Sequence, residues 1–162
     1  MADKKTRWVV STLAHGADLN WDWNTIELLA NEYVPSILVE NVSGYIESMP
    51  TSVTKCVYAI IGITDAGGSF PFDTNTLATL TNDALLDTFI DDKRKNIWMT
   101  LGGFSKANVA VPEDIMKWEF NAKSKRKLLQ GQKLYLIIGA RNHLTNTAEN
   151  TNYSVDMTTF FS

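Results

Sequence analysis

The sequence has little that could cross-link the chain covalently or hold it in a membrane. Its single cysteine, Cys56, cannot form an intramolecular disulfide, so we expect a reducing compartment. The longest apolar run, residues 134–138, is far too short to span a bilayer. The first residues also lack the apolar segment of a signal peptide. A chain of 162 residues is therefore predicted to form one domain, residues 1–162, with an ordinary core and no membrane contact.

Residues that carry out catalysis or bind metals are also scarce. The two histidines, His15 and His143, each lie beside a predicted strand end, and no spacing typical of a zinc site joins them to Cys56. The sequence contains neither a nucleophile elbow nor a glycine-rich phosphate loop. We therefore predict a protein that is not an enzyme, with no catalytic residues, no metal and no cofactor.

What the sequence does contain is strand periodicity. Alternating apolar and polar residues predict strands with one wet face at 115–125 and 153–161, and in the second of these Tyr153, Val155, Met157 and Phe161 share the apolar face. Runs that are apolar on both faces predict central strands at 54–64 and 132–141. The remaining strands are predicted at 6–14, 23–30, 36–49 and 95–101.

Eight strands with long connections favour an all-β fold, an antiparallel eight-stranded jelly-roll sandwich. An immunoglobulin-like sandwich or an open barrel would accommodate the same strands. At most one short helix is expected, capped by Asn82 and extending to about residue 90. Residues 1–7 are expected to form a short flexible arm before the first strand.

The net charge of −3, from 15 Lys and Arg against 18 Asp and Glu, hides an uneven distribution. Residues 117–141 hold seven cations and one carboxylate, a net charge of +6. The rest of the chain holds eight cations and seventeen carboxylates, a net charge of −9. Such asymmetry predicts a basic contact surface on an otherwise acidic protein, although a charge run can also be simply a solvated strand end.

The centre of this segment resembles a known pattern. The run from Phe120 to Ile138, FNAKSKRKLLQGQKLYLII, resembles coat proteins of small circular single-stranded DNA viruses, in which a basic strand of the type K-x-x-R-K-L leads into an apolar one. Three further stretches are similar in the same order, so the resemblance covers roughly residues 37–141. They are VENVSGYI from Val39, YAIIGI from Tyr58 and IWMT from Ile97.

The resemblance implies a structural protein of the virion: a jelly roll whose copies, about 60 in a minimal shell, enclose a small genome, here single-stranded DNA. Such coats usually begin with a long arginine-rich arm, whereas this chain has only three cations there, and it has Val42-Ser43 where an arginine is often found. We predict phosphate contacts without base specificity. The candidate nucleic-acid-binding residues are Lys123, Lys125, Lys127 and Arg126, together with Lys4, Lys5 and Arg7.

Alternation predicts that Lys123 and Lys125 share a face with Lys117 and that Arg126 points the opposite way. The turn between the basic strand and the apolar one is predicted at Gly131.

A second function, from a different class, is a carbohydrate- or receptor-binding module. Its natural surface would be Trp21, Trp23 and the Asn- and Thr-rich stretch 142–152. At alternating positions, the two tryptophans more simply share one face of a strand as part of the packing.

Overall fold

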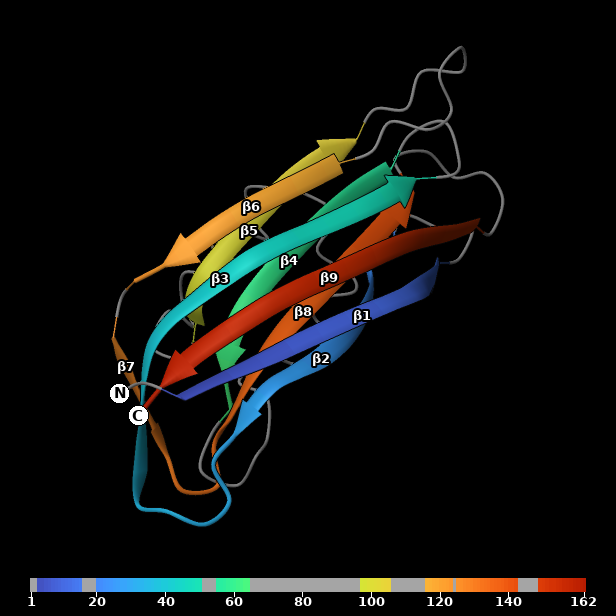
Figure 1. The fold of residues 1–162 in the computed structure, drawn as a ribbon. Helices are drawn as coiled ribbons and strands as arrows, with labels where there is room; N and C mark the ends of the chain where they lie inside the picture. The colour runs from blue at the N-terminus through green and yellow to red at the C-terminus, as the bar shows by residue number, and fades with distance from the viewer. Residues whose placement is uncertain are drawn as a thin grey trace.

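The computed structural model describes residues 3–15, 20–50, 55–64, 97–105, 116–123, 125–142 and 149–162. These residues form two antiparallel sheets that lie face to face (Figure 1). The strands are β1 (Asp3–His15), β2 (Asp22–Ala30), β3 (Ser36–Pro50), β4 (Lys55–Ile63), β5 (Ile97–Ser105), β6 (Met116–Ala122), β7 (Arg126–Leu129), β8 (Lys133–Asn142) and β9 (Glu149–Phe161). The helix predicted from Asn82 lies outside the described residues.

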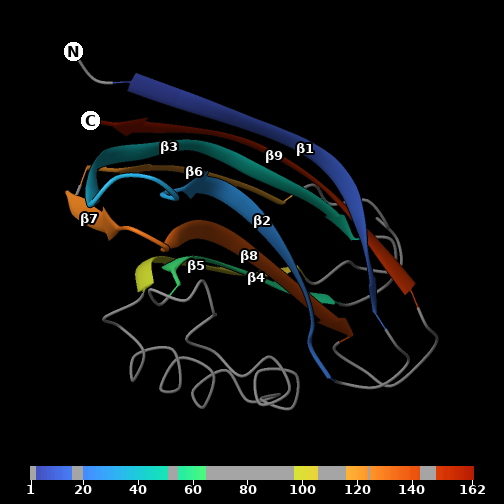
Figure 2. The same ribbon diagram turned by 90° about the horizontal axis from the view of Figure 1, so that it is seen from below.

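The order of the strands identifies the fold. One sheet has the order β1-β9-β3-β6 and the other β2-β8-β4-β5. The short strand β7 pairs with the beginning of β3, from Ser36 to Val39. Successive strands therefore alternate between the sheets almost throughout, and the first and last strands are neighbours (Figure 2). This is the jelly-roll arrangement, as predicted, and neither an immunoglobulin-like sandwich nor an open barrel.

The core lies between the two sheets, and the predicted alternation places it correctly in β9. Tyr153, Val155 and Met157 are buried, and Phe161 packs partly buried against the same cluster. In β8 three consecutive residues, Leu136, Ile137 and Ile138, are buried. This confirms the prediction that 132–141 is apolar on both faces of a central strand.

Two details of the prediction are wrong. Residues 3–7 are not a flexible arm, because Asp3 to Arg7 pair with Phe161 to Met157 as the beginning of β1. The last strand runs to Phe161 and so provides backbone partners for the whole of this segment. Strand 115–125 ends earlier than predicted, at Ala122, and the chain forms the additional strand β7 after it, which gives nine strands in the described residues instead of eight.

No helix long and apolar enough to cross a membrane occurs among the residues described.

Candidate nucleic-acid interface

The predicted basic strand is interrupted because its partner, β3, is irregular. β6 pairs with β3 from Ser48 down to Val42, and β7 pairs with β3 from Val39 down to Ser36. Between these two stretches, the pairing of β3 with β9 shifts register between Val39 and Asn41, which is the signature of a bulge. Pairing with β3 therefore ends at Ala122 and begins again at Arg126. Lys123 and Lys125 lie in this short gap and are both exposed.

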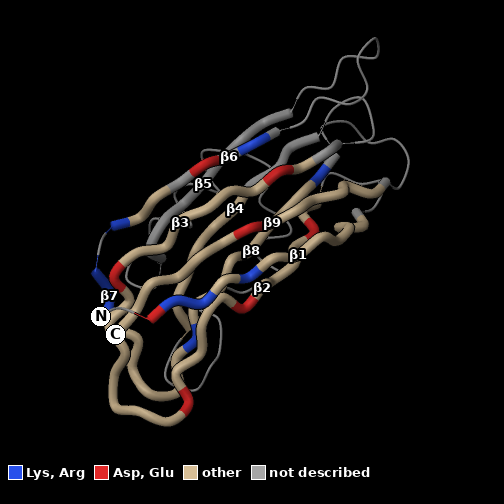
Figure 3. The backbone as a smooth tube through the Cα atoms, in the orientation of Figure 1, with Lys and Arg blue, Asp and Glu red and all other residues tan. Residues whose placement is uncertain are grey.

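The strand register brings the two predicted basic segments to the same end of one sheet. Asp3 pairs with Phe161, Phe161 with Val39, and Val39 with Arg126. The start of β1 and the start of β7 are thus aligned, three strand spacings or about 14 Å apart. Figure 3 shows their cations gathered at the end of the sandwich where both described ends of the chain lie.

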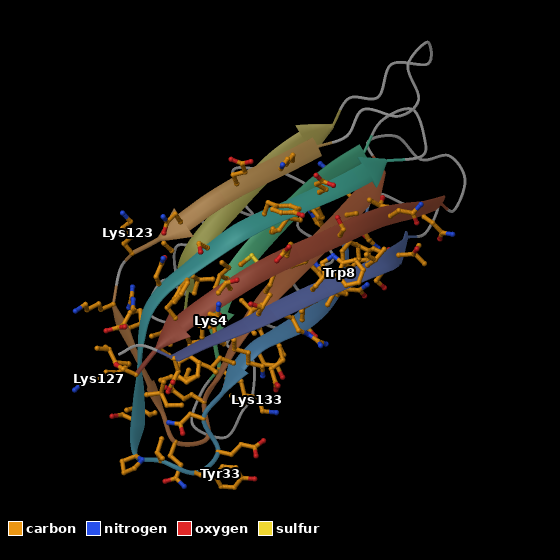
Figure 4. The ribbon with its side chains drawn as sticks, in the orientation of Figure 1. Lys4, Trp8, Tyr33, Lys123, Lys127 and Lys133 are labelled. Carbon is orange, nitrogen blue, oxygen red and sulfur yellow. The ribbon has the colours of Figure 1, made fainter. Side chains whose placement is uncertain are left out.

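The cations do not all face the same way. Lys4 is exposed on the outer face of the sheet, where it lies opposite Phe160 of β9. Lys127 pairs with Leu38, next to the inward-facing Val39, and is therefore also on the outer face, in keeping with the labelled side chains in Figure 4. Lys5 and Arg7 are exposed at the edge of the sheet but belong to its inner face, because their partners Thr159 and Met157 are buried.

Arg126 differs from its neighbours. It is the cross-strand partner of the buried Val39 and is itself half-buried, whereas Lys125 and Lys127 are exposed. This agrees with the prediction that Arg126 points away from the lysines beside it. The outer-face candidates at this end are therefore Lys4 and Lys127, with Lys123 and Lys125 exposed in the gap between β6 and β7.

Two other lysines of the sheets, Lys117 and Lys133, lie close to carboxylates. The ammonium of Lys117 lies 3.9 Å from Glu47, 3.4 Å from Glu119 and 4.7 Å from the centre of the Tyr45 ring. Lys133 lies 3.5 Å from Glu27. Within the described part of the chain, none of the seven candidate cations forms an ion pair with a carboxylate. Two carboxylates, Asp3 and Glu40, lie at the same end, but the cations outnumber them. The remaining like charges repel each other, which favours binding of an anion there.

A feature that the sequence did not reveal is a pair of hydrogen-bonded loops next to β7, the β2–β3 connection at residues 31–35 and the β7–β8 turn at residues 130–132. The Gly131 N–H donates to the Asn31 carbonyl at 2.7 Å, and the Asn31 side-chain amide donates to the Leu128 carbonyl at 2.8 Å. Gly131 has a φ of 87° and follows Gln130 in the turn closed by the Gln132 N–H, as a type II turn requires. The predicted turn at Gly131 is confirmed, and hydrogen bonds hold it against the β2–β3 connection.

Two large side chains are exposed here, one on the β2–β3 connection and one at the end of β7. Tyr33 is 86% exposed and Leu129 is 49% exposed. A hydrogen bond to the Glu32 carboxylate, together with its negative charge, raises the pKa of Tyr33 above its usual value. In the sequence, the short connection at residues 31–35 contains one Asn and one Pro, which predicts a loop but not what it contacts.

The residues of the alternative binding module are placed less favourably. Trp21 is 1% exposed, its ring lies 5.3 Å from that of Trp23, and the Arg141 guanidinium lies 5.4 Å from its centre. The ring of Trp23 also packs directly on Gly139. Both rings are thus used in packing, which matches the alternative that they share one face. Trp21 is buried and Trp23 is only partly exposed. Residues 143–148 of the Asn- and Thr-rich stretch lie outside the described residues.

Among the described residues there is no group of three His, Cys, Asp or Glu side chains that could hold a metal ion.

Comparisons with known proteins give structural likeness only. No family model matches this chain, and no curated protein matches its sequence. A VP2 subviral particle of infectious bursal disease virus is similar over 97% of this chain, with 8% identity and a TM-score of 0.43. A structure of the Gx strain of the same virus is similar over 98% of this chain, with 10% identity and a TM-score of 0.39. This chain spans about a third of the length of both, 32% in each case. The assignment of the jelly roll rests on the strand order given above.

Proposed function

We propose that this chain is a viral coat protein that assembles with copies of itself into an icosahedral shell around a nucleic-acid genome, and that it is not an enzyme. The observation that carries the proposal is the meeting of two sequence-distant basic segments at one end of a jelly roll. Their cations are exposed except for the half-buried Arg126, and none forms an ion pair with a carboxylate among the described residues. Segregated positive charge is what the inner surface of a shell around a polyanion requires.

The contacts we propose are to phosphates and carry no sequence preference. Lys4, Lys123, Lys125 and Lys127 are exposed and have flexible side chains, so they can follow a backbone of irregular shape. Lys5 and Arg7 would contribute from the edge of the sheet, and the half-buried Arg126 would act mainly by its charge. The type of genome, single-stranded DNA, follows from the sequence resemblance.

The charge available limits what such a shell can neutralise. With about 60 copies, each directing inward the +6 segment and the net +2 of residues 3–7, the interior carries at most about +480. The coding region for 162 residues alone has 486 nucleotides, each with one phosphate. The protein charge could therefore barely neutralise the chain's own coding region. We expect mobile cations to neutralise most of a genome, or the shell to package little nucleic acid.

The salt dependence of binding to a single-stranded oligonucleotide tests the phosphate contacts. Replacing Lys123 and Lys127 with Gln removes two phosphate-binding cations, so the slope of log K against log salt should become shallower by about 1.4, or about 0.7 for each lysine replaced. The matched control is the double replacement of Lys117 and Lys133 with Gln, which removes equal charge from lysines held by Glu47, Glu119 and Glu27. Its slope should be close to that of the unmodified chain.

Equal slopes for the two double variants would contradict a specific basic site. The sequence of the oligonucleotide should have little effect on affinity, because no base-reading contact is proposed. A strong preference for one sequence would contradict the proposal as well.

A further inference from the structure

The outer edge of β1 is the longest unpaired strand edge that the described sheets present. β1 has 13 residues, pairs with β9 on one side, and pairs with no described strand on the other. An edge of this length exposes a row of backbone N–H and C=O groups that another strand can pair with. Trp8 and Val10, 67% and 64% exposed, stand on its outer face.

The cations of β1 are confined to one half of the strand. Lys4, Lys5 and Arg7 all precede Trp8, and the remaining residues as far as Ala14 are uncharged. When two such strands pair antiparallel, registers centred on Lys5, Thr6 or Arg7 place cation against cation. Centring on Val9, the midpoint of Asp3–His15, instead places the basic half of each strand against the uncharged half of the other.

We propose that β1 of a second copy of this chain pairs antiparallel with β1 along this edge, in the register centred on Val9. This register gives the greatest overlap, since all 13 residues find a partner. It places Trp8 opposite Val10 twice on the outer face, an aromatic and β-branched pairing that stabilises sheets. The cations thus oppose the registers centred on Lys5, Thr6 or Arg7, and the greatest overlap selects the register centred on Val9 among the others.

The pairing makes one continuous sheet across the two copies, related by a two-fold axis at Val9. Even-numbered residues of β1 stay on the outer face in both copies, because this axis is perpendicular to the sheet. Arg7 of each copy then faces Ser11 of the other, at the edge of the groove that Arg7, Ser11 and Trp23 line in one chain. This pairing supplies a self-contact for the proposed shell, but the dimer itself does not depend on the shell.

Adding a positive charge at Ser11, and then reversing the charge of Arg7, tests the register. Ser11→Lys puts two cations opposite each other, about 5 Å apart between Cβ atoms, whereas positions 7 and 11 of one chain are roughly 13 Å apart. We expect this variant to be smaller in solution than the unmodified chain by sedimentation. Adding Arg7→Asp should restore the original species. The control is Asn121→Lys, an equal charge on the exposed face of β6, which should change nothing.

Disulfide cross-linking provides a second test that does not depend on charge. In the proposed register Thr6 faces Thr12 of the other copy, whereas these residues are about 20 Å apart in one strand. A chain with both Thr6→Cys and Thr12→Cys should form a covalent dimer under mild oxidation. The Thr6→Cys chain and the unmodified chain, which keeps Cys56, should not.

The outcomes separate this inference from the proposed function. Assemblies that are insensitive to Ser11→Lys, with no cross-link between positions 6 and 12, would overturn the pairing and leave the shell standing. Dimers that respond to the charge changes but never form particles would support the pairing and count against the shell. A chain that remains monomeric at all concentrations would contradict both.

Discussion

Gly44 shows how a single residue is determined by its neighbour strand. It lies in the middle of β3 with a φ of 147°, and a Cβ atom there would collide with the backbone of Asp156 in β9. Glycine is thus required both for the backbone conformation and for the close approach of the two strands.

We predict that Gly44→Ala lowers the free energy of unfolding by about 3 kcal/mol, because strain and a backbone clash add together. Gly131→Ala, at a φ of 87° in a surface turn, is the comparison and should cost only about 1–2 kcal/mol. Urea unfolding measures the loss of unfolding free energy in both variants, provided that the slope of this free energy against urea concentration is unchanged. Equal losses in the two variants would show that the contact with Asp156 is unimportant.

At this scale, periodicity predicts burial well but cannot predict partners. The alternation in 153–161 correctly places Tyr153, Val155 and Met157 in the core. The same residues give no information on which strand lies beside them. The requirement for glycine at position 44 depends on Asp156, more than 100 residues away, and so cannot be derived from the local sequence.

At the scale of the element, β1 and the β6–β7 segment differ from prediction for the same reason. Residues 123–127 continue a strand-like pattern, but the irregular pairing of β3 near Glu40 interrupts the ladder and exposes Lys123 and Lys125. Residues 3–7 become part of a strand because β9 continues to Phe161. In both cases the partner strand determines where the strand begins or ends.

Removing residues 1–7 tests the revised start of β1. The deletion eliminates five cross-strand pairs between Asp3–Arg7 and β9, each worth roughly 0.2–1 kcal/mol, so we predict a loss of about 2 kcal/mol in unfolding free energy. Replacing Lys4, Lys5 and Arg7 together with Gln keeps the strand and should change stability by less than about 0.5 kcal/mol. A deletion without effect would restore the interpretation of this segment as a free arm.

At the scale of the whole molecule, the charge asymmetry acquires a physical location. The two predicted basic segments are separated by 116 positions in the sequence, from Arg7 to Lys123. They nevertheless lie at one end of one sheet. Strand number and alternation led to the jelly roll, but they could not show that β1 and β7 are aligned through β9 and β3. That alignment depends on long-range pairing, which local patterns do not encode.

The most direct test of the central claim is the mass of the purified full chain in solution, measured by sedimentation together with its absorbance ratio at 260 and 280 nm. A minimal shell of about 60 copies of the 18.1-kDa chain should have a protein mass of roughly 1.1 MDa. We expect such a particle, with nuclease-resistant nucleic acid that is released as salt rises. A chain that stays monomeric or forms only small oligomers, without nucleic acid, would contradict the claim.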